Sequence, residues 1–195
     1  MNRLILPALS LIAATFAQAQ TPTPTPTPTL NLVQELSSRA DLSTFYKFVN
    51  GTPLANQLMT TGSDGRGFTV FAPTDDAFAN VPAQVLTAMK SDPDIAKQIL
   101  EYSVVPVSQN LSDLQIGMNR LTLEGEGLEL ATAASGALIT MTPLGLGAPV
   151  PSSTEALVVS PDVAATNGVI QVVNRVLLPP SLYPKLGIKV ELGTN

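Results

Sequence analysis

The sequence contains no cysteine and no histidine. Without cysteine the chain can form no structural disulfide, thiolate nucleophile, cysteine-ligated zinc or iron–sulfur cluster. Without histidine it lacks the imidazole of a Ser–His–Asp triad and the commonest side-chain ligand of transition metals. An enzyme built from this chain would therefore depend on carboxylates, lysine, tyrosine or a hard metal ion.

Charged residues are also few. They make up 13% of the 195 residues, and the net charge is −5 with a pI near 4.6. The lysines and arginines are scattered, so no basic face is available to follow a phosphate backbone, and we expect no nucleic-acid binding. An apolar content of 45% supplies enough material for the core of one domain.

The first 19 residues have the features of a secretory signal peptide. Arg3 precedes an apolar run over residues 4–16, and Ala17-Gln18-Ala19 follows as a cleavage site. The run is shorter than the roughly 20 residues that span a bilayer. We predict a signal peptide over 1–19 and a secreted, extracytoplasmic protein in the periplasm or at the cell surface, not membrane-spanning; a short N-terminal anchor is the alternative.

Residues 20–29 contain the repeat TPTPTPTPT. Alternating proline fixes φ and removes every second N–H, so neither a helix nor a strand ladder can form and polyproline II remains. The segment is either a stiff spacer that holds the folded part away from its surroundings or a solubilising tail.

The folded region is predicted over residues 30–180, with a C-terminal tail over 181–195. Apolar residues recur at helical spacing up to about residue 106, and from Gly117 the pattern alternates with period two. No internal repeat is present. The order predicts a single α+β domain with an antiparallel sheet partly capped by helices.

Two stretches carry the strongest local signals. In FTVFAPTDDAFANVP, residues 68–82, a strand ends at Pro73 and Thr74 caps a helical turn. In NGVIQVVNRVLLPP, residues 167–180, a tight turn leads into a strand that is apolar on both faces and should be central or sandwiched. The structural positions of the two blocks are Phe71, Pro73, Thr74, Asp75, Phe78, Asn167, Gly168 and Arg175.

The candidate carboxylate sites favour structural roles. Asp75 and Asp76 diverge by about 100° on a helix, so they favour capping over acid–base chemistry. Arg175 could pair with either carboxylate or be solvated. Glu124, Glu126 and Glu129 suit an acidic hairpin better than a weak calcium site, because no loop of spaced oxygen ligands surrounds them. With no nucleophile elbow or phosphate-binding loop either, we expect a protein without catalytic activity or cofactor.

The two blocks, in this order and about ninety residues apart, resemble the signatures of the fasciclin-like (FAS1) domain family, with ILEYSVVP at 99–106 between them. The resemblance implies a FAS1-like β-sandwich wedge with helices packed around it. It also implies an extracellular role in adhesion, without a shared catalytic site; some relatives bind apolar ligands, including carotenoids.

The chain departs from the family pattern at two positions. Ser103 stands where the family has the histidine of a Tyr-His segment, and Gln171 stands where many members carry histidine. The resemblance makes Tyr102, Val104 and Val105 the candidate interaction segment. Alternatively, Tyr102 is a core residue with a satisfied hydroxyl.

Three functions follow from these patterns. The first is an interaction module that binds a protein, a polysaccharide, or a matrix or envelope component. The second is a carrier of an apolar small molecule, a lipid or carotenoid, suggested by the glycine- and alanine-rich residues 131–151. The third, a carboxylate-dependent hydrolase, has the least support.

Overall fold

The structure is a computed structural model that describes residues 27–61, 65–114, 119–132, 139–143 and 156–188. The predicted signal peptide at 1–19, most of the predicted spacer at 20–29 and the end of the tail at 181–195 lie outside the described residues.

The helices occupy mainly the first half of the chain, as predicted. Side chains cap several of them: Asn31 caps the first helix, Asp92 caps the helix that begins at Pro93, and the predicted cap Thr74 is confirmed. The α-helices are α1 (Leu32–Ser38), α2 (Ser43–Val49), α3 (Pro53–Leu58), α4 (Asp75–Ala79), α5 (Ala83–Ser91) and α6 (Pro93–Tyr102), with 3-10 turns η1 (Ala40–Leu42), η2 (Leu111–Asp113) and η4 (Pro180–Leu182).

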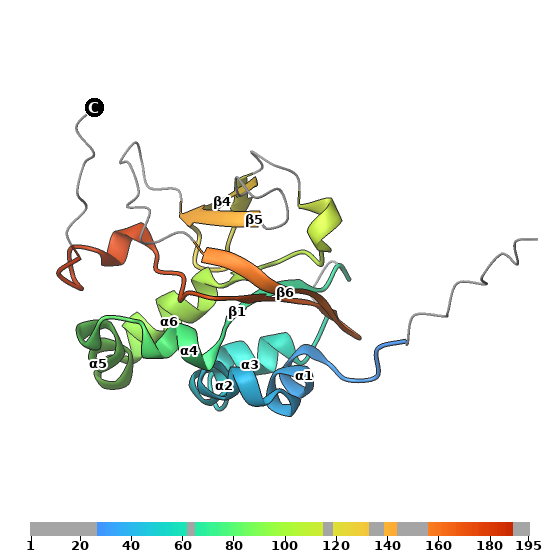
Figure 1. Cartoon of the computed structure of the whole chain (residues 1–195). Helices are drawn as coiled ribbons and strands as arrows, with labels where there is room; N and C mark the ends of the chain where they lie inside the picture. The colour runs from blue at the N-terminus through green and yellow to red at the C-terminus, as the bar shows by residue number, and fades with distance from the viewer. Residues whose placement is uncertain (1–26, 62–64, 115–118, 133–138, 144–155, 189–195) are drawn as a thin grey trace, which may run out of the picture.

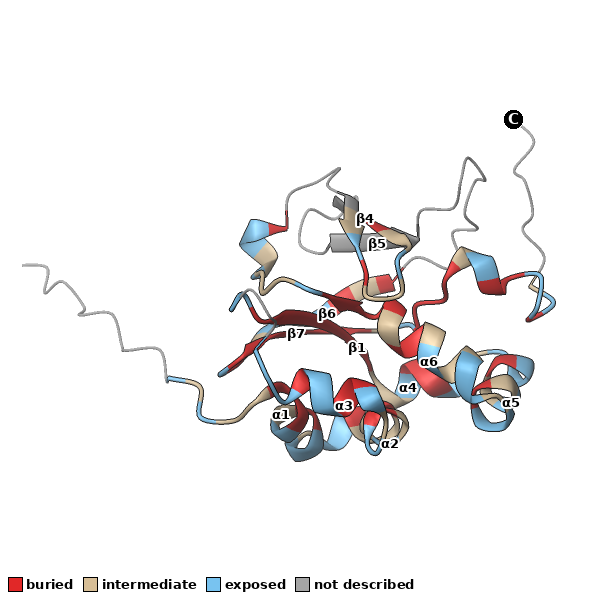
Figure 2. Ribbon diagram, turned by 180° about the vertical axis from the view of Figure 1, so that it is seen from behind, coloured by how far each residue is buried: buried red, intermediate tan, exposed pale blue. Residues whose placement is uncertain are grey.

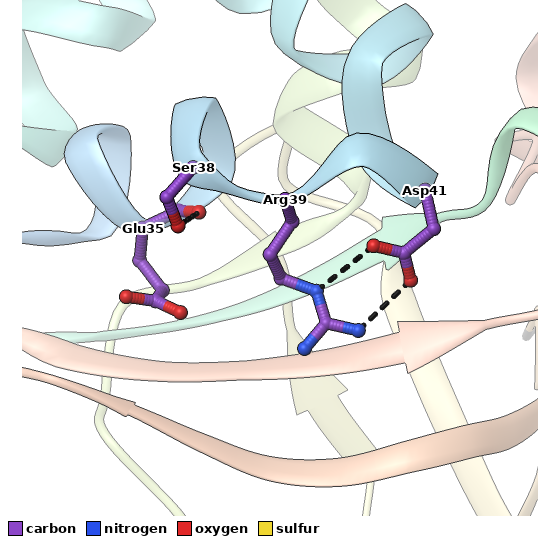
Figure 3. Close-up of polar contacts among 4 residues, drawn as sticks. All are labelled: Glu35, Ser38, Arg39 and Asp41. Carbon is purple, nitrogen blue, oxygen red and sulfur yellow. Dashed lines mark hydrogen bonds and ion pairs between the residues drawn. The ribbon is translucent and has the colours of Figure 1, made fainter.

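A polar turn separates α1 from α2 (Figure 3). Arg39 makes two hydrogen bonds to the carboxylate of Asp41, with Nε to Oδ1 at 3.1 Å and Nη2 to Oδ2 at 2.8 Å. The Ser38 hydroxyl donates to the carbonyl of Glu35 at 2.8 Å. Both charged side chains are partly exposed, so the pair contributes at most about 1 kcal/mol and mainly fixes the direction of the turn.

The strands form one seven-stranded arrangement in the order β2-β1-β7-β6-β5-β4-β3. Their bounds are β1 Phe68–Pro73, β2 Val104–Val105, β3 Asn119–Leu121, β4 Gly127–Thr132, β5 Ile139–Pro143, β6 Ala156–Ala165 and β7 Gly168–Val173.

The expectation of a wholly antiparallel sheet is wrong at one pair. β1 and β7 run parallel, with Phe68 opposite Gly168 and Pro73 opposite Val173, whereas the neighbours β2 and β6 pair antiparallel. A parallel pair requires a long crossover, and the helices and strands between β1 and β7 supply it. The predicted central position of β7 is confirmed, since it lies between β1 and β6 and all six of its residues are buried.

The helices cover one face of the β1–β7–β6 strands, and β4 and β5 lie beyond the opposite face (Figure 1). Buried residues concentrate in β1 and β7 and on the helix faces turned toward them (Figure 2). The α+β prediction is confirmed. The β-sandwich wedge, which the resemblance implies, and the single domain, which the order of helices and strands without an internal repeat predicts, stay predictions.

Two apolar clusters lie on the two faces of the sheet, because successive strand residues point to opposite sides. The helix-side core includes Leu36, Phe45 and Phe78 together with Val70 and Ile170. The strand-side core consists of Phe71, Tyr102, Val105, Leu114, Leu128, Ala156, Val158, Val173 and Leu177.

Candidate functional site

The candidate interaction segment is buried. Tyr102 and Val104 have no exposed surface, and Val105 is 2% exposed. The Tyr102 hydroxyl donates to the carbonyl of Gly127 at 3.1 Å, as a satisfied core tyrosine would. Burial, together with nearby acidic groups, raises the pKa of Tyr102, so the hydroxyl stays protonated and keeps this bond. The segment therefore belongs to the interior, and its side chains are not available for external contacts.

Ser103, which replaces the family's histidine, is turned inward as well. It is 1% exposed, and its hydroxyl donates to the carbonyl of Ile99 at 3.1 Å. Its backbone carbonyl accepts from the N–H of Phe71 at 2.8 Å. Position 103 therefore joins the end of α6 to β1 and presents no side chain for external contacts.

Gln171 is a buried polar residue in the middle of β7. It has no exposed surface. Its Oε1 accepts from the N–H of Asp162 at 3.0 Å, and its Nε2 donates to Asp162 Oδ1 at 2.8 Å and to the carbonyl of Gln109 at 3.4 Å. One amide thus donates and accepts at the same time, which satisfies both of its polar atoms in the interior.

Asp162 lies in a β-bulge of β6. The pairing of β6 with β7 shifts register between Val158 and Ser160 and again between Ser160 and Val163. Asp162 has φ +56, in the left-handed region that asparagine and aspartate tolerate best. Its Oδ1 also accepts from the N–H of Leu111 at 2.7 Å. These bonds offset the backbone strain and tie the bulge to η2.

A second set of bonds holds the loop before η2. The Thr69 hydroxyl, on β1, donates to the carbonyl of Val107 at 2.6 Å and accepts from the N–H of Gln109 at 2.9 Å. The N–H of Ser108 donates to the carbonyl of Arg66 at 3.0 Å. We name residues 106–113 and 160–163 together the loop–bulge surface. All residues of this surface are exposed or half-buried. Val105 and Leu114, which flank the loop 106–113, are buried in the core.

The first block docks α2 onto α4. Phe71 and Pro73 are buried in β1, and the Phe78 ring stacks on Phe48 with centroids 5.7 Å apart. Asp75 accepts from the Ser43 hydroxyl at 2.8 Å and from the N–H of Thr44 at 2.7 Å. The sequence placed Asp75 correctly in the first turn of a helix but gave no signal for these bonds to α2.

Asp75 is held in its ionised form. Burial by itself raises its pKa, but the hydrogen bonds from Thr44 and Ser43 and the charge of Lys47 outweigh that effect and leave the pKa below its ordinary value. Arg175 is exposed, and it and Asp76 both line a hollow of about 730 Å³ next to α4. The suggested ion pair of Arg175 with one of the two aspartates stays a prediction.

Asn167 fastens the β6–β7 turn to the helices. It is 7% exposed; its Oδ1 accepts from the N–H of Leu32 at 2.9 Å, and its Nδ2 donates to the carbonyls of Leu58 at 2.8 Å and Thr60 at 3.0 Å. The next residue, Gly168, has to be glycine, because a Cβ at this position would lie 2.2 Å from the carbonyl oxygen of Phe68. The Asn-Gly pair was predicted as a turn; its contacts to α1 and α3 depend on residues far away in the sequence.

The acidic hairpin between β3 and β4 is half-buried. The N–H of Glu126 donates to the carboxylate of Glu124 at 3.3 Å, and Glu126 accepts from the N–H of Ser181 at 3.3 Å. Burial and the neighbouring charge of Glu126 raise the pKa of Glu124. The side chain of Glu129 lies outside the described ones. Within the described ranges, no three acidic, histidine or cysteine residues gather in a way that could hold a metal ion.

The fasciclin-domain model matches residues 40–179, which contain the first block and the second block up to Pro179. The chain belongs to the fasciclin domain family. Protein sll1483 of Synechocystis is 32% identical over 153 residues, which cover 77% of this chain and 74% of that protein. Human periostin is 28% identical over 146 residues, covering 75% of this chain and 15% of periostin.

A solved structure shows the same fold. A FAS1 domain pair from the insect cell adhesion molecule fasciclin I matches with a TM-score of 0.53 and 20% identity, covering 70% of this chain and 45% of that one. The chain thus spans less than half of that structure and only a small part of periostin. In the part of the chain that the structure describes, no helix combines the length and apolar character needed to cross a bilayer.

Proposed function

We propose that this fasciclin-domain protein is a secreted or surface-displayed interaction module without catalytic activity. Its partner would be a protein, a polysaccharide, or a matrix or envelope component, bound at the loop–bulge surface. The observation that carries the proposal is the buried Gln171 amide, which bonds to both the backbone N–H and the carboxylate of the exposed Asp162.

A surface that is ordered before binding loses less conformational entropy when a partner binds. Here the loop bonds to β1 through Thr69, and the bulge bonds to β7 through Gln171. Tyr102 and Val105 belong to the strand-side core, against which Val107 and Leu111 of the loop pack, whereas Val104 belongs to the helix-side core. Tyr102 and Val105 would thus position this surface from below. The exposed residues Asn110, Ser112 and Asp162 then offer polar groups in fixed places.

The comparisons support an adhesive role. The solved relative is described as a cell adhesion molecule. The predicted signal peptide at 1–19 would direct this chain out of the cytoplasm, to the periplasm or cell surface, and the spacer at 20–29 would hold the domain away from its neighbours. The alternative role as a carrier of a lipid or carotenoid came from residues 131–151; the side chains of this stretch lie outside the described ones, so that role stays a prediction.

The test is binding of the protein that begins at residue 20 to envelope fractions, purified polysaccharides and a second copy of itself. Ser112→Arg places a bulky cation on the loop–bulge surface, and the matched control Gln57→Arg places it at an exposed position of α3. We expect the first change to reduce binding at least tenfold and the second to leave it unchanged. Equal binding by both variants would place the contact elsewhere, and absence of binding to every component would reject the function.

A further inference from the structure

A groove of about 590 Å³ lies among α2, α3, α5 and α6, a volume within the usual range of small-molecule sites. Its lining includes Phe48, Leu54, Met89 and Leu100, of which the last three are buried. These side chains come from four different helices, so the apolar lining is a product of the fold. Its position among the helices places it across the sheet from η2 and the loop–bulge surface (Figures 1 and 2).

Three lysines also line this groove. Lys47 of α2, Lys90 of α5 and Lys97 of α6 all line the groove and are exposed. They are three of only five lysines in a chain with a net charge of −5. Lys47 and Lys90 lie in the last turns of their helices, where a cation offsets the carbonyl ends. This preference for cations at helix C-termini does not explain why three lysines from three different helices line the same groove.

The acidic groups of the lining leave the lysines available. Asp94 and Glu101 also line the groove, so the lining carries three positive and two negative side chains. Lys97 lies 3.9 Å from Glu101, at the outer limit of an ion pair, and its side chain is 62% exposed. A pair of this kind contributes little and gives way readily to a stronger partner.

We propose that this groove binds a single-chain amphiphile with an anionic head, such as a free fatty acid. The alkyl chain would lie along the apolar lining, and the carboxylate would lie among the three lysines, which keep their stems on apolar surface while the ammonium groups reach solvent. An uncharged lipid or polyene could fill the groove but would offer no anionic group to the three lysines. The proposal is independent of the interaction function, because it involves a separate surface.

The first experiment titrates saturated fatty acids into the protein that begins at residue 20, by displacement of a fluorescent fatty acid. We expect affinity to rise about threefold to fourfold for each added CH₂ until the groove is full. The methyl ester of the same chain should bind at least tenfold more weakly than the acid, whereas the alkyl sulfate should bind like the acid. Equal binding of acid and ester would reject the anionic head, and no dependence on chain length would reject the apolar lining.

The second experiment locates the site. The triple change Lys47→Gln, Lys90→Gln and Lys97→Gln should weaken binding about tenfold at low salt and much less near 1 M salt, where exposed charges are screened. Lys185→Gln removes an exposed lysine elsewhere and should have no effect.

Filling the groove tests the same site without changing charge. Ala96→Trp, from the half-buried lining of α6, should abolish binding, and Ala83→Trp, exposed on α5 outside the groove, should not. Ala96→Leu serves the same purpose if the tryptophan variant unfolds. Unchanged affinity in both the lysine and the folded filling variants would overturn the proposal, and neither result bears on binding at the loop–bulge surface.

Discussion

At position 171 an amide occupies the place where the family resemblance leads one to look for histidine. An imidazole changes charge near pH 6.5 and, when neutral, donates from one nitrogen only. The Gln171 amide donates and accepts at any pH, and it uses both atoms on Asp162. The hydrogen bonds that position the β6 bulge therefore do not depend on the protonation of residue 171.

Gln171→Leu tests this network. The change leaves the N–H of Asp162 without its acceptor and removes one of the two donors to Asp162 Oδ1, which we expect to cost about 1–3 kcal/mol in the free energy of unfolding. The control is Gln109→Leu, because among the described residues the buried Oε1 of Gln109 has no hydrogen-bond partner, so little is lost with it. Urea unfolding measures both. A Gln171 variant as stable as the Gln109 variant would show that the network does not stabilise the bulge.

Phe78→Ala removes a ring that is 3% exposed and stacked on Phe48. We expect a loss of about 3–5 kcal/mol, from lost burial and from the cavity that remains in the helix-side core. Thermal and urea unfolding provide the measurement. Met59→Ala is the control, since Met59 is 49% exposed and should lose less than about 1 kcal/mol. A melting temperature that barely moves in the Phe78 variant would contradict its place in the core.

Asp75→Ala should produce a pH-dependent loss of stability. The folded-state pKa of Asp75 is lowered, so its stabilisation is present above the unfolded pKa near 4 and is lost as pH falls through the lower folded pKa. We expect the variant to be less stable than the parent by about 1–2 kcal/mol at pH 7. The difference should shrink below pH 4. A difference that is constant from pH 7 to pH 2 would mean that the ionised carboxylate is not responsible.

At the scale of elements, a substitution at Gly67 has two energetic costs: the strain of its left-handed backbone and a clash with the β6–β7 turn. A comparison with Gly65 separates the two. Gly65 has φ +73 and Gly67 has φ +70, but a Cβ at 65 meets nothing within 4 Å, whereas one at 67 would lie 2.5 Å from the carbonyl oxygen of Asn167. Gly65→Ala should cost about 1–2 kcal/mol for the left-handed conformation alone. Gly67→Ala should cost about 1–3 kcal/mol more, from the clash with backbone. Similar losses in urea unfolding would remove the argument for a close approach.

Elements specified by adjacent residues were predictable from the sequence. Thr74 and Asp92 cap their helices because each bonds to N–H groups within three residues, and β7 was recognised by apolar residues on both faces. The parallel pairing of β1 with β7 joins residues about one hundred positions apart, which periodicity cannot reveal. It was therefore missed, and the antiparallel expectation was wrong at that pair.

The candidate site was predictable only in part. The buried position of Tyr102 and its satisfied hydroxyl match one of the two interpretations drawn from the sequence. The contacts of Gln171 with Asp162 and Gln109 depend on a bulge in β6, and the apolar pattern of that strand does not predict the bulge. One signal was available, because Pro161-Asp162 inside a strand pattern is typical of a bulge or turn.

At the scale of the whole molecule, the two cores share β1 and β7. Leu36 belongs to the helix-side core and Leu128 to the strand-side core, and both are fully buried. Because β1 and β7 contribute side chains to both cores, we expect the described part of the protein to unfold in a single cooperative transition. Leu36→Ala and Leu128→Ala should each lower the stability by about 2–5 kcal/mol and move the same transition.

The measurement is urea unfolding followed by circular dichroism and by tyrosine fluorescence. Coincident curves in the parent and in both variants are the expected result. Two separated transitions, with each variant shifting a different one, would show that the cores belong to independently folding units.

The parallel pairing of β1 with β7 has a consequence for the order in which the chain folds. Residue 68 lies opposite residue 168, so the centre of the sheet forms only after a loop of about one hundred residues has closed. Contacts of such sequence separation slow folding, and at synthesis rates of about 5–20 residues per second β1 waits several seconds for its partner. Until then the helix-forming segments that are already synthesised lack the β1–β7 pair that they cover in the folded protein (Figure 1).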